Sequence, residues 1–268
     1  MGQTDKPDAL IAAYARELFD AERMRSSIQP ITERDAGFNV DDAYAVQLEN
    51  VRRALSMGHT VSGKKIGLTS PGIQKQLGVN EPDYGHLFAA MDCADGEVNT
   101  SALILPKIEA ELAFILKADL TGGDVGVRDV MEATDYIAGA FEIVDSRIAD
   151  WRIKLPDTVA DNASSGRYIL GKTRVRPGEA DLSAVSMKLY KSCGSDVTLA
   201  GEGTGSAVLG DPYLSVAWLA NKLWGYGVTL KAGEVVLSGA FSAAPEAAKG
   251  DAFRAEFTRF GVVEARFI

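Results

Sequence analysis

Apolar residues in the first part of the chain recur every three or four positions, the spacing of one face of an amphipathic helix. This pattern predicts a helix over Pro7–Arg25 and a second helix from Asp41 or Asp42, either of which can cap it, to Met57. A third, short helix is predicted over Ser70–Gly78, because a proline stands at its first helical position. The N-terminal part is therefore expected to be helical.

Further along the chain, short apolar runs bounded by glycine and proline turn signals predict strands. The predicted strands are Leu103–Leu116, Ala140–Val144, Glu234–Ser238, Ala252–Thr258 and Val262–Ile268. Two further helices are predicted, over Val127–Ala138 and from Asp211 to Trp224. The pattern indicates an α+β protein with a helical N-terminal region over residues 1–70 and a β-rich body over residues 71–268, or with both in one continuous domain.

The charge balance narrows the range of partners. The 268 residues include 28 Lys and Arg against 37 Asp and Glu, a net charge of -9. Nucleic acids and anionic membranes bind clustered basic residues, so we expect neither as a partner. No stretch reaches the roughly 18 apolar residues of a membrane span, and the N-terminal Met1–Lys6 has no apolar core of an export signal. We expect a cytoplasmic protein whose two cysteines, Cys93 and Cys193, are reduced thiols.

Two acidic residues stand out in the predicted strand that ends at Leu116. Side chains alternate between the faces of a strand, so Glu109 and Glu111 share one face, which becomes apolar at Ala113 and Ile115. Two carboxylates on such a face repel each other and resist desolvation, and a bound divalent cation removes both problems. The alternative is that this face meets water at the edge of a sheet.

A third acid, Glu142, lies inside another apolar strand, where an unpaired carboxylate is unusual. A salt bridge to Arg147 or to a lysine would also account for it. Three acids without a cluster of histidines or cysteines form an oxygen-only ligand set, which suits Mg²⁺ or Mn²⁺ better than zinc. The sequence therefore indicates a magnesium or manganese site.

Two loops add further candidates. The run Gly63–Ser70 puts a lysine in an apolar, glycine-flanked strand end, where it could bind an anion, act as acid or base, or simply be solvated. The polar run over residues 161–166 is either an ordinary turn or a source of hydrogen bonds to a ligand carboxylate. The glycine-rich run Gly201–Gly205 matches neither a dinucleotide fingerprint nor a phosphate-binding loop, and we interpret it as a turn. We expect no catalytic role for His59 or His86.

Taken together, the motifs resemble the 2-hydroxypenta-2,4-dienoate (2-keto-4-pentenoate) hydratases of aromatic meta-cleavage pathways, within the fumarylacetoacetase-like superfamily. The resemblance extends over nearly the whole chain. The matching motifs are Lys65–Thr69, Leu77–Val79, Glu81–Gly85, Pro106–Glu111, Val144–Trp151, Asp157–Ser164, Val216–Asn221 and Ala232–Gly239. The resemblance implies a fumarylacetoacetase C-terminal-like β-roll or barrel as the body of the protein.

The resemblance also implies roles for individual residues. The metal-binding glutamates of the family match Glu109, Glu111 and Glu142, which bind Mg²⁺ or Mn²⁺. The active-site lysine of the family matches Lys65 and its acidic loop residue matches Asp83; which of these two is the acid and which the base stays open. The substrate-contacting serine of the family matches Ser164, and we add Arg147, inside a matching motif, as a second substrate-binding residue.

The implied activity is a lyase reaction, the metal-dependent addition of water to a small 2-hydroxy-2,4-dienoate to give a 4-hydroxy-2-oxo acid, in aromatic or steroid meta-cleavage catabolism. The related 4-oxalocrotonate decarboxylases carry an apolar residue at the position of Asp83, so Asp83 favours the hydratase. The decarboxylase, a hydrolase of C–C bonds in acylpyruvates and a purely structural partner are the alternatives. The family also implies a homo-oligomer and association with a related decarboxylase.

Overall fold

The computed structural model describes residues 6–268. The expectation about an export signal concerns Met1–Lys6, and the first five of these residues lie outside the described residues. The helices are α1 (Asp8–Met24), α2 (Ile31–Arg34), α3 (Val40–Ser56), α4 (Pro71–Leu77), α5 (Val127–Ala133), α6 (Leu155–Ala160) and α7 (Pro212–Trp224). The strands are β1 (Val61–Gly67), β2 (Asp83–Phe88), β3 (Glu97–Val98), β4 (Pro106–Leu116), β5 (Thr134–Asp145), β6 (Ser165–Leu170), β7 (Ser186–Cys193), β8 (Asp196–Thr204), β9 (Val235–Leu237), β10 (Asp251–Phe257) and β11 (Gly261–Phe267).

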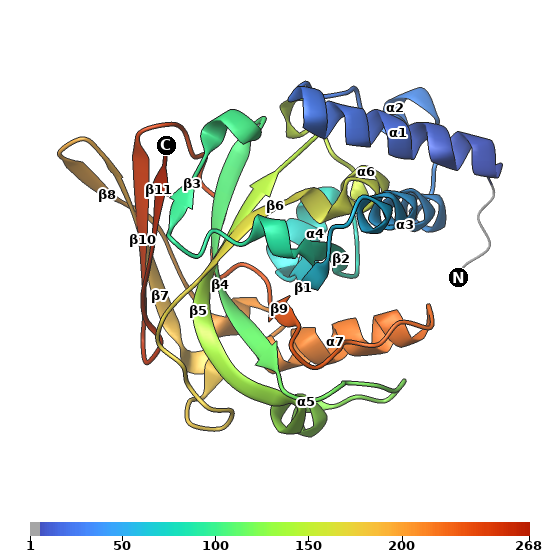
Figure 1. The fold of residues 1–268 in the computed structure, drawn as a ribbon. Coiled ribbons are helices and arrows are strands. Elements are labelled where there is room, and N and C mark those ends of the chain that lie inside the picture. The colour runs from blue at the N-terminus through green and yellow to red at the C-terminus, as the bar shows by residue number, and fades with distance from the viewer. Residues whose placement is uncertain (1–5) are drawn as a thin grey trace.

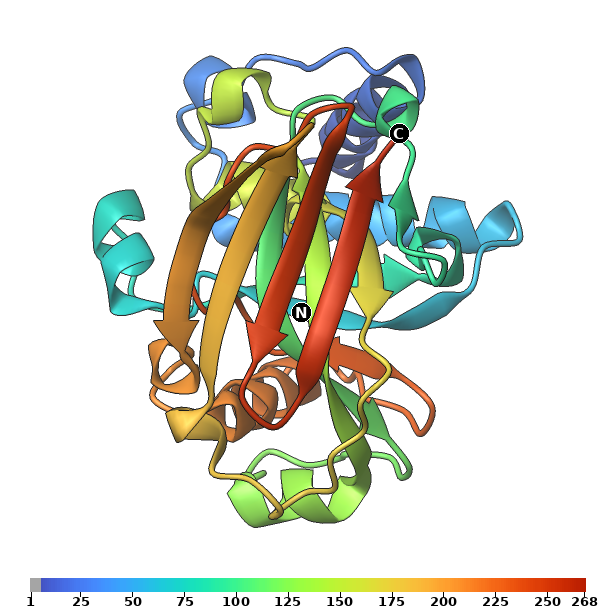
Figure 2. The ribbon, with the colours of Figure 1, turned by 90° about the vertical axis from the view of Figure 1, so that its left-hand side faces the viewer.

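The strands form two sheets. The six-stranded sheet has the order β2-β1-β9-β4-β5-β6, and all its neighbours are antiparallel except β1 and β9. The five-stranded sheet has the order β3-β11-β10-β7-β8. Figure 1 shows β7, β8, β10 and β11 on one side of the long, curved strands β4 and β5, and Figure 2 shows the five-stranded sheet from its outer face. The two sheets therefore enclose a core between them.

Alternation along β4 supplies one wall of that core. Ile108, Ala110, Leu112 and Phe114 point to the same face and are completely buried in the main hydrophobic cluster. The facing sheet contributes phenylalanines from β10 and β11, which pack edge to face with each other or with Phe241. The opposite face of β4 carries the acidic residues, and the fold thus separates the core face from the candidate site face.

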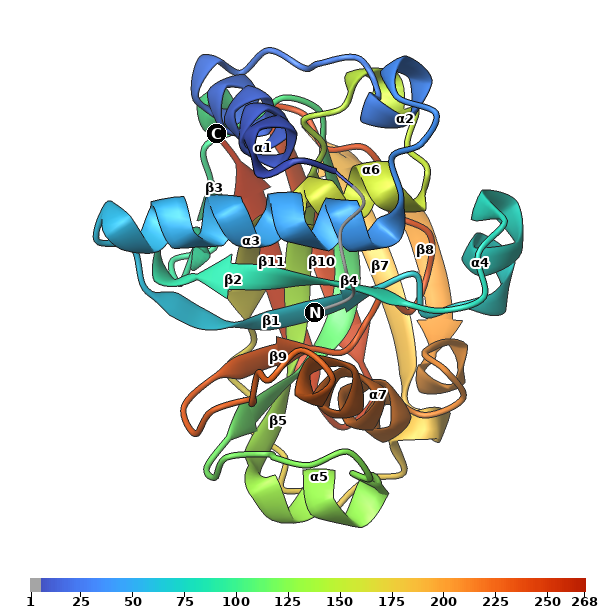
Figure 3. The same ribbon diagram turned by 90° about the vertical axis from the view of Figure 1, so that its right-hand side faces the viewer.

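Helices cover the other side of the molecule. In Figure 3, α3 and α7 flank the strands β2, β1 and β9 on the side away from the five-stranded sheet. Tyr44 of α3 stacks on Tyr84 of β2 with 4.7 Å between ring centroids. Gln47 of α3 donates hydrogen bonds to the carbonyls of Tyr84 and Val159, at 3.0 and 2.8 Å. The helix α3 is therefore fixed to both β2 and α6.

The structure confirms the α+β class, the N-terminal helices and most predicted elements. Among the predicted elements, the main differences concern their ends, whereas β7 and β8 were not predicted. The helix α3 is capped by Asn39 rather than Asp41 or Asp42: the Asn39 side chain accepts from the Asp42 amide, and the Asp42 carboxylate accepts from the Asn39 amide. The predicted helix Val127–Ala138 ends at Ala133, because the residues after it pair with β4 and are part of β5.

The interpretation of Gly201–Gly205 as a turn was wrong, since most of this run lies in β8, which pairs with β7. Its glycines permit close backbone approach: a Cβ on Gly203 or Gly205 would overlap the carbonyl oxygen of Phe241 or Leu182. The predicted boundary between an N-terminal region and the body at residue 70 stays a prediction. The strand β1 lies just before this position and pairs with β2 and β9, which lie after it. Among the residues that the structure describes, no helix has the length and apolar character needed to cross a membrane.

Candidate metal centre and active site

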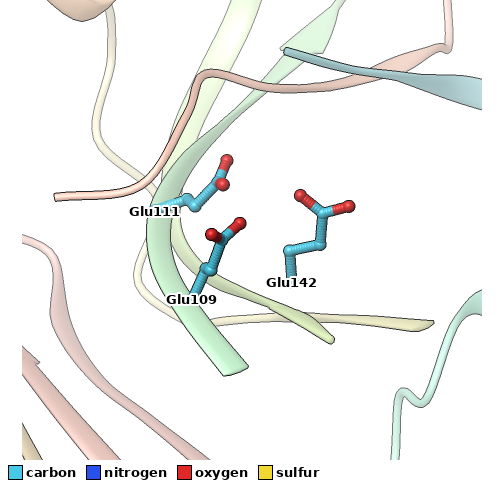
Figure 4. A group of neighbouring side chains, drawn as sticks. All are labelled: Glu109, Glu111 and Glu142. Atoms are coloured by element: carbon cyan, nitrogen blue, oxygen red, sulfur yellow. The ribbon is translucent and has the colours of Figure 1, made fainter. Parts of the chain in front are cut away.

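Three glutamates converge on the face of β4 and β5 that lies away from the core. Glu109 and Glu111 are two residues apart on β4, and Glu109 lies directly opposite Glu142 in the antiparallel β4–β5 register. Each residue offers one carboxylate oxygen, and these oxygens lie within 4.8 Å of one another. Figure 4 shows the three carboxylates pointing toward a common space. Strand alternation and sheet register together create this cluster.

The cluster is short of positive charge and hydrogen bonds. Glu111 and Glu142 are completely buried. Glu111 Oε1 and both carboxylate oxygens of Glu142 have no hydrogen-bond partner, although Glu111 Oε2 accepts from the Gly239 amide at 2.8 Å. Burial, followed by repulsion within the cluster, raises the pKa of Glu111 well above its usual value, and burial raises the pKa of Glu142 to about 8. Unpaired, buried carboxylate oxygens fit a hard divalent cation.

This arrangement predicts a pH-dependent instability in ion-free protein. The folded protein binds more protons than the unfolded chain between the ordinary glutamate pKa of 4.5 and the raised pKa of Glu142, about 8. The glutamate cluster should therefore lower the free energy of unfolding progressively as pH rises from about 5 to about 8, by a few kcal/mol in total. Denaturant unfolding in EDTA gives the free energy of unfolding of the wild type and of Glu142→Gln at each pH. The difference between the two proteins measures the contribution of the carboxylate. An equal pH dependence of the two proteins would contradict the prediction.

Lys65 supplies the positive charge nearest to the glutamates. Its Nζ lies 3.3 Å from Glu142 Oε2 and donates a hydrogen bond of 2.9 Å to the Ala163 carbonyl. Burial alone would lower the pKa of Lys65, but the neighbouring carboxylates, first Glu142 and then Asp83, outweigh burial and raise it. Lys65 is therefore a buried ammonium. Of the two predicted partners for Glu142, a lysine is the one that the structure shows, because Arg147 forms its ion pair with Asp161.

Asp83 faces Lys65 across the β1–β2 ladder. It is the first residue of β2, pairs with Gly67 in the register and is 1% exposed. Its Oδ2 accepts from the Thr158 hydroxyl at 3.4 Å, while its Oδ1 has no hydrogen-bond partner. Burial raises the pKa of the Asp83 carboxyl, although Lys65 lowers it in part. A carboxylate with a raised pKa and a free oxygen is suited to accept a proton.

Gly67 makes room for this carboxylate. A Cβ built on Gly67 would overlap Asp83 Oδ1 and would lie 3.4 Å from Lys65 Nζ. We therefore expect Gly67→Ala to displace Asp83 and to lower kcat about a hundredfold, the effect of misplacing a reacting group by about 1 Å. Steady-state kinetics with thermal unfolding as a control measures this. Gly72→Ala, which has no atoms near its added Cβ, is the matched control. Full activity of Gly67→Ala would contradict the assignment.

A cavity of about 560 Å³ opens above the cluster. Lys65, Asp83, Glu109 and Ser164 line it, and the fully buried Glu111 and Glu142 lie behind them. Its lining also includes Lys107, whose Nζ lies 4.4 Å from the centre of the Trp151 ring, and Phe241. The lining thus combines charged groups with apolar side chains. This combination suits a small molecule with one anionic end.

The structure brings six of the seven predicted site residues together, namely Lys65, Asp83, Glu109, Glu111, Glu142 and Ser164. Ser164 is 3% exposed, and its hydroxyl donates to Asp161 at 3.4 Å. Arg147 does not join them: it lines a second cavity, and its guanidinium is bound by Asp161 and backbone carbonyls. His86 is also elsewhere, with its ring bonded to Gln47 and its pKa lowered to about 3 by burial.

Sequence reasoning missed several contributors to the site. The Ala163 carbonyl, the Gly239 amide and the Thr158 hydroxyl each bond a charged group of the site. Two of them are backbone atoms, for which residue type carries no signal. The sequence did carry a signal for Gly67. This glycine follows the candidate lysine Lys65 by two residues, so both lie on the same face of the strand.

Comparisons with known proteins agree with this geometry. Residues 97–268 match the family described as fumarylacetoacetate (FAA) hydrolase C-terminal. The chain is 43% identical to a 2-hydroxyhexa-2,4-dienoate hydratase of Comamonas testosteroni over 260 residues, 96% of this chain and 97% of that protein. It is 45% identical to a 2-keto-4-pentenoate hydratase of Paraburkholderia xenovorans (strain LB400) over 254 residues, 94% of this chain and 93% of that protein.

A solved structure has nearly the same fold. The 4-oxalocrotonate decarboxylase from Pseudomonas putida G7, complexed with magnesium and adipate, superimposes with a TM-score of 0.93 and 36% sequence identity. The match covers 99% of this chain and 100% of that chain. The match confirms the predicted fold, but it does not separate hydratase from decarboxylase.

Proposed function

Because the chain belongs to the fumarylacetoacetate hydrolase family, we propose that it is a metal-dependent hydratase of small 2-hydroxy-2,4-dienoates. The observation that carries this proposal is the cluster of Glu109, Glu111 and Glu142 behind a cavity that also contains Lys65 and Asp83. The similarity of this chain to two hydratases, over more than nine tenths of its length, supports the same activity. The substrate is 2-hydroxypenta-2,4-dienoate or a close homologue.

The proposed ion is Mg²⁺ or Mn²⁺. The three glutamates provide only oxygen ligands, which Mg²⁺ and Mn²⁺ prefer. Glu111 Oε1 and both carboxylate oxygens of Glu142 have no hydrogen-bond partner and are therefore available to such an ion. When bound, the ion supplies a Lewis acid that stabilises negative charge on the 2-oxygen of the substrate. Glu109, Glu111 and Glu142 would hold it. The magnesium in the similar decarboxylase structure supports this choice.

The reaction begins by moving a proton. Protonation of the dienol at C5, with loss of the proton from the 2-hydroxyl, gives a 2-oxo-3-enoate that is electrophilic at C4. Lys65, an ammonium held between Glu142 and the Ala163 carbonyl, stabilises the negative charge or delivers the proton. Ser164 lies in the cavity wall and binds the substrate carboxylate or the oxygen beside it.

Water then adds across C3 and C4. Asp83 has one oxygen without a hydrogen-bond partner and a raised pKa, so it orients the water and accepts its proton. Hydroxide bonds to C4, a proton reaches C3, and the product is a 4-hydroxy-2-oxo acid. The alternative is the reverse assignment, with Lys65 as the base and Asp83 as the acid, because both groups line the cavity.

A 4-oxalocrotonate decarboxylase is the second candidate, because a structure of such an enzyme superimposes on this chain with a TM-score of 0.93. Asp83 argues for the hydratase, because hydration needs a group that orients and deprotonates water, whereas loss of CO₂ does not. The buried position of Asp83 beside Lys65 provides such a group. We therefore keep hydration as the proposed reaction.

The assembly and location of the protein are also proposals. We propose a homo-oligomer that works in the cytoplasm and associates with a related decarboxylase, in aromatic or steroid meta-cleavage catabolism. Light scattering of the purified protein tests the first part. Co-purification with the decarboxylase tests the second, and a monomer that binds no decarboxylase would contradict both.

The proposed reaction is tested with 2-hydroxypenta-2,4-dienoate, whose loss is followed by its ultraviolet absorbance with Mg²⁺ and with EDTA. 4-Oxalocrotonate serves as the comparison substrate. We expect fast, Mg²⁺-dependent loss of the dienoate to a 4-hydroxy-2-oxo acid without CO₂. Release of CO₂ from 4-oxalocrotonate, with no loss of the dienoate, would establish the decarboxylase instead.

A further inference from the structure

Three consecutive residues beside Lys65 adopt an uncommon backbone conformation. Asn162, Ala163 and Ser164, here called the arch, have φ angles of 55°, 50° and 54°. None is a glycine, and L residues rarely adopt this left-handed conformation even singly. Such a run persists only where the surrounding structure imposes it. The arch therefore needs an identifiable restraint.

Packing alone does not provide that restraint. Ala163 and Ser164 line the 560 Å³ cavity of the candidate site. Asp161, Asn162 and Ser165 line a second cavity of about 440 Å³ between the arch and the helices α1 and α3. The arch is thus a thin partition with a cavity on each side. Polar contacts must hold it in place.

Arg147 and Asp161 supply most of those contacts at the base of the arch. The Arg147 Nε donates to Asp161 Oδ1 at 2.5 Å, and its Nη2 donates to the Asp161 carbonyl at 2.5 Å. Its Nη1 donates to the carbonyls of Asp145 and Ser165, at 2.6 and 2.9 Å. The arginine, which is 5% exposed, therefore binds the chain on both sides of the arch and ties it to the end of β5.

A second set of contacts fixes the arch from β2. The Asn162 side chain accepts from the His86 amide at 2.7 Å and donates to the His86 carbonyl at 2.9 Å. Gly85 lies below it, and a Cβ there would overlap the Asn162 carbonyl oxygen. Gly85 is also the register partner of Lys65. The arch and the lysine are thus positioned against the same point of the sheet.

The consequence concerns the Lys65 ammonium. The arch directs the Ala163 carbonyl to Lys65 Nζ, at 2.9 Å, and this bond and the Glu142 carboxylate at 3.3 Å are the two contacts that define the position of the ammonium. The same arch carries the Ser164 hydroxyl. A shift of the arch would move both groups relative to the cavity.

We propose that Arg147 is a positioning residue rather than a substrate-binding one, and that its clamp on Asp161 holds the arch so that Ala163 and Ser164 are placed for the reaction. This inference rests on the proposed function for its kinetic part. Lysine cannot replace the arginine, because an ammonium cannot make the planar, forked set of bonds that the guanidinium makes. The clamp touches none of the metal-binding glutamates.

The experiment compares Arg147→Met and Arg147→Lys with the wild type. Arg152→Met is the matched control, because Arg152 lies nearby on the surface and pairs with Glu33. We expect kcat to fall about a hundredfold in both Arg147 variants and KM to rise, because the arch carries Ser164, while the calorimetric Mg²⁺ affinity stays near the wild-type value. Unchanged kcat, or losses of kcat and Mg²⁺ affinity in equal proportion, would overturn the proposal.

Two further variants keep the test decisive if single replacements unfold. Arg147→Met/Asp161→Asn removes both buried charges and leaves neither unpaired. Gly85→Ala displaces the arch from the opposite side, through the Asn162 carbonyl and the Ser165 hydroxyl, and leaves Arg147 and Asp161 unchanged. Both should show the same loss of kcat with unchanged Mg²⁺ affinity, and full kcat in either folded variant would overturn the proposal.

A crystal structure separates this inference from the proposed function. A wild type without activity on dienoates would refute the hydratase. In that case the distance from Lys65 Nζ to the Ala163 oxygen in Arg147→Met still tests the clamp. A lengthened contact and altered φ angles in the arch support the clamp, and an unchanged arch overturns it.

Discussion

The Glu142→Gln variant is expected to lose about a thousandfold in kcat/KM while its ion-free form becomes more stable. The loss follows from weaker binding of the ion, whose charge stabilisation contributes several kcal/mol to the reaction. The gain follows because glutamine removes a carboxylate whose burial outweighs its ion pair with Lys65 at 3.3 Å and raises its pKa to about 8. The opposite signs of the two effects distinguish this result from a loss of activity caused by unfolding.

Thermal unfolding and steady-state kinetics measure these two effects in parallel. Added Mg²⁺ should raise the melting temperature of the wild type and leave that of Glu142→Gln nearly unchanged, because a ligand that binds only the folded state stabilises it. Glu132→Gln is the matched control, since Glu132 is an exposed residue paired with Arg128 on α5. Wild-type activity of Glu142→Gln at limiting Mg²⁺ would remove Glu142 from the ion site.

Asp83→Asn should abolish hydration while it leaves ion binding intact. Asparagine keeps the shape of the side chain and cannot accept a proton, so a loss of about 10²- to 10⁴-fold in kcat is expected for a general base. The Mg²⁺ affinity should stay close to that of the wild type, because Asp83 is not one of the three clustered glutamates.

Calorimetric titration of Mg²⁺ and rate measurements with the dienoate test this prediction together. Asp92→Asn, in the turn that follows β2, controls for the loss of a carboxylate. A variant with full activity would refute the role of Asp83. Loss of Mg²⁺ affinity in parallel with kcat would instead place Asp83 among the residues that bind the ion.

The sequence predicted the acidic cluster because a strand has a period of two residues. That period placed Glu109 and Glu111 on one face, and the apolar surroundings of Glu142 indicated burial. The register that sets Glu109 opposite Glu142 is a tertiary property, and only the sheet shows it. The family resemblance supplied Lys65, Asp83 and Ser164, which the structure brings to the same cavity.

Other features could not be predicted in this way. The hairpin of β7 and β8 was missed because its apolar alternation is short: in β7 only Met187 and Leu189 are buried, and most of β8 is exposed. The arch was missed because its residues are ordinary turn formers, and its conformation depends on contacts with Arg147 and β2. The sequence analysis placed Arg147 among the substrate-binding residues, because the local sequence does not show that Asp161 is its ion-pair partner.

The most direct test of the central claim is a Mn²⁺ titration of the ion-stripped wild type in the presence of 2-hydroxypenta-2,4-dienoate. Bound ion is measured by electron paramagnetic resonance, and formation of the 4-hydroxy-2-oxo acid is measured in the same samples. The account predicts one tightly bound ion per chain and a rate of hydration proportional to the bound fraction. Full hydratase activity in the stripped protein, or full occupancy without formation of product, would contradict it.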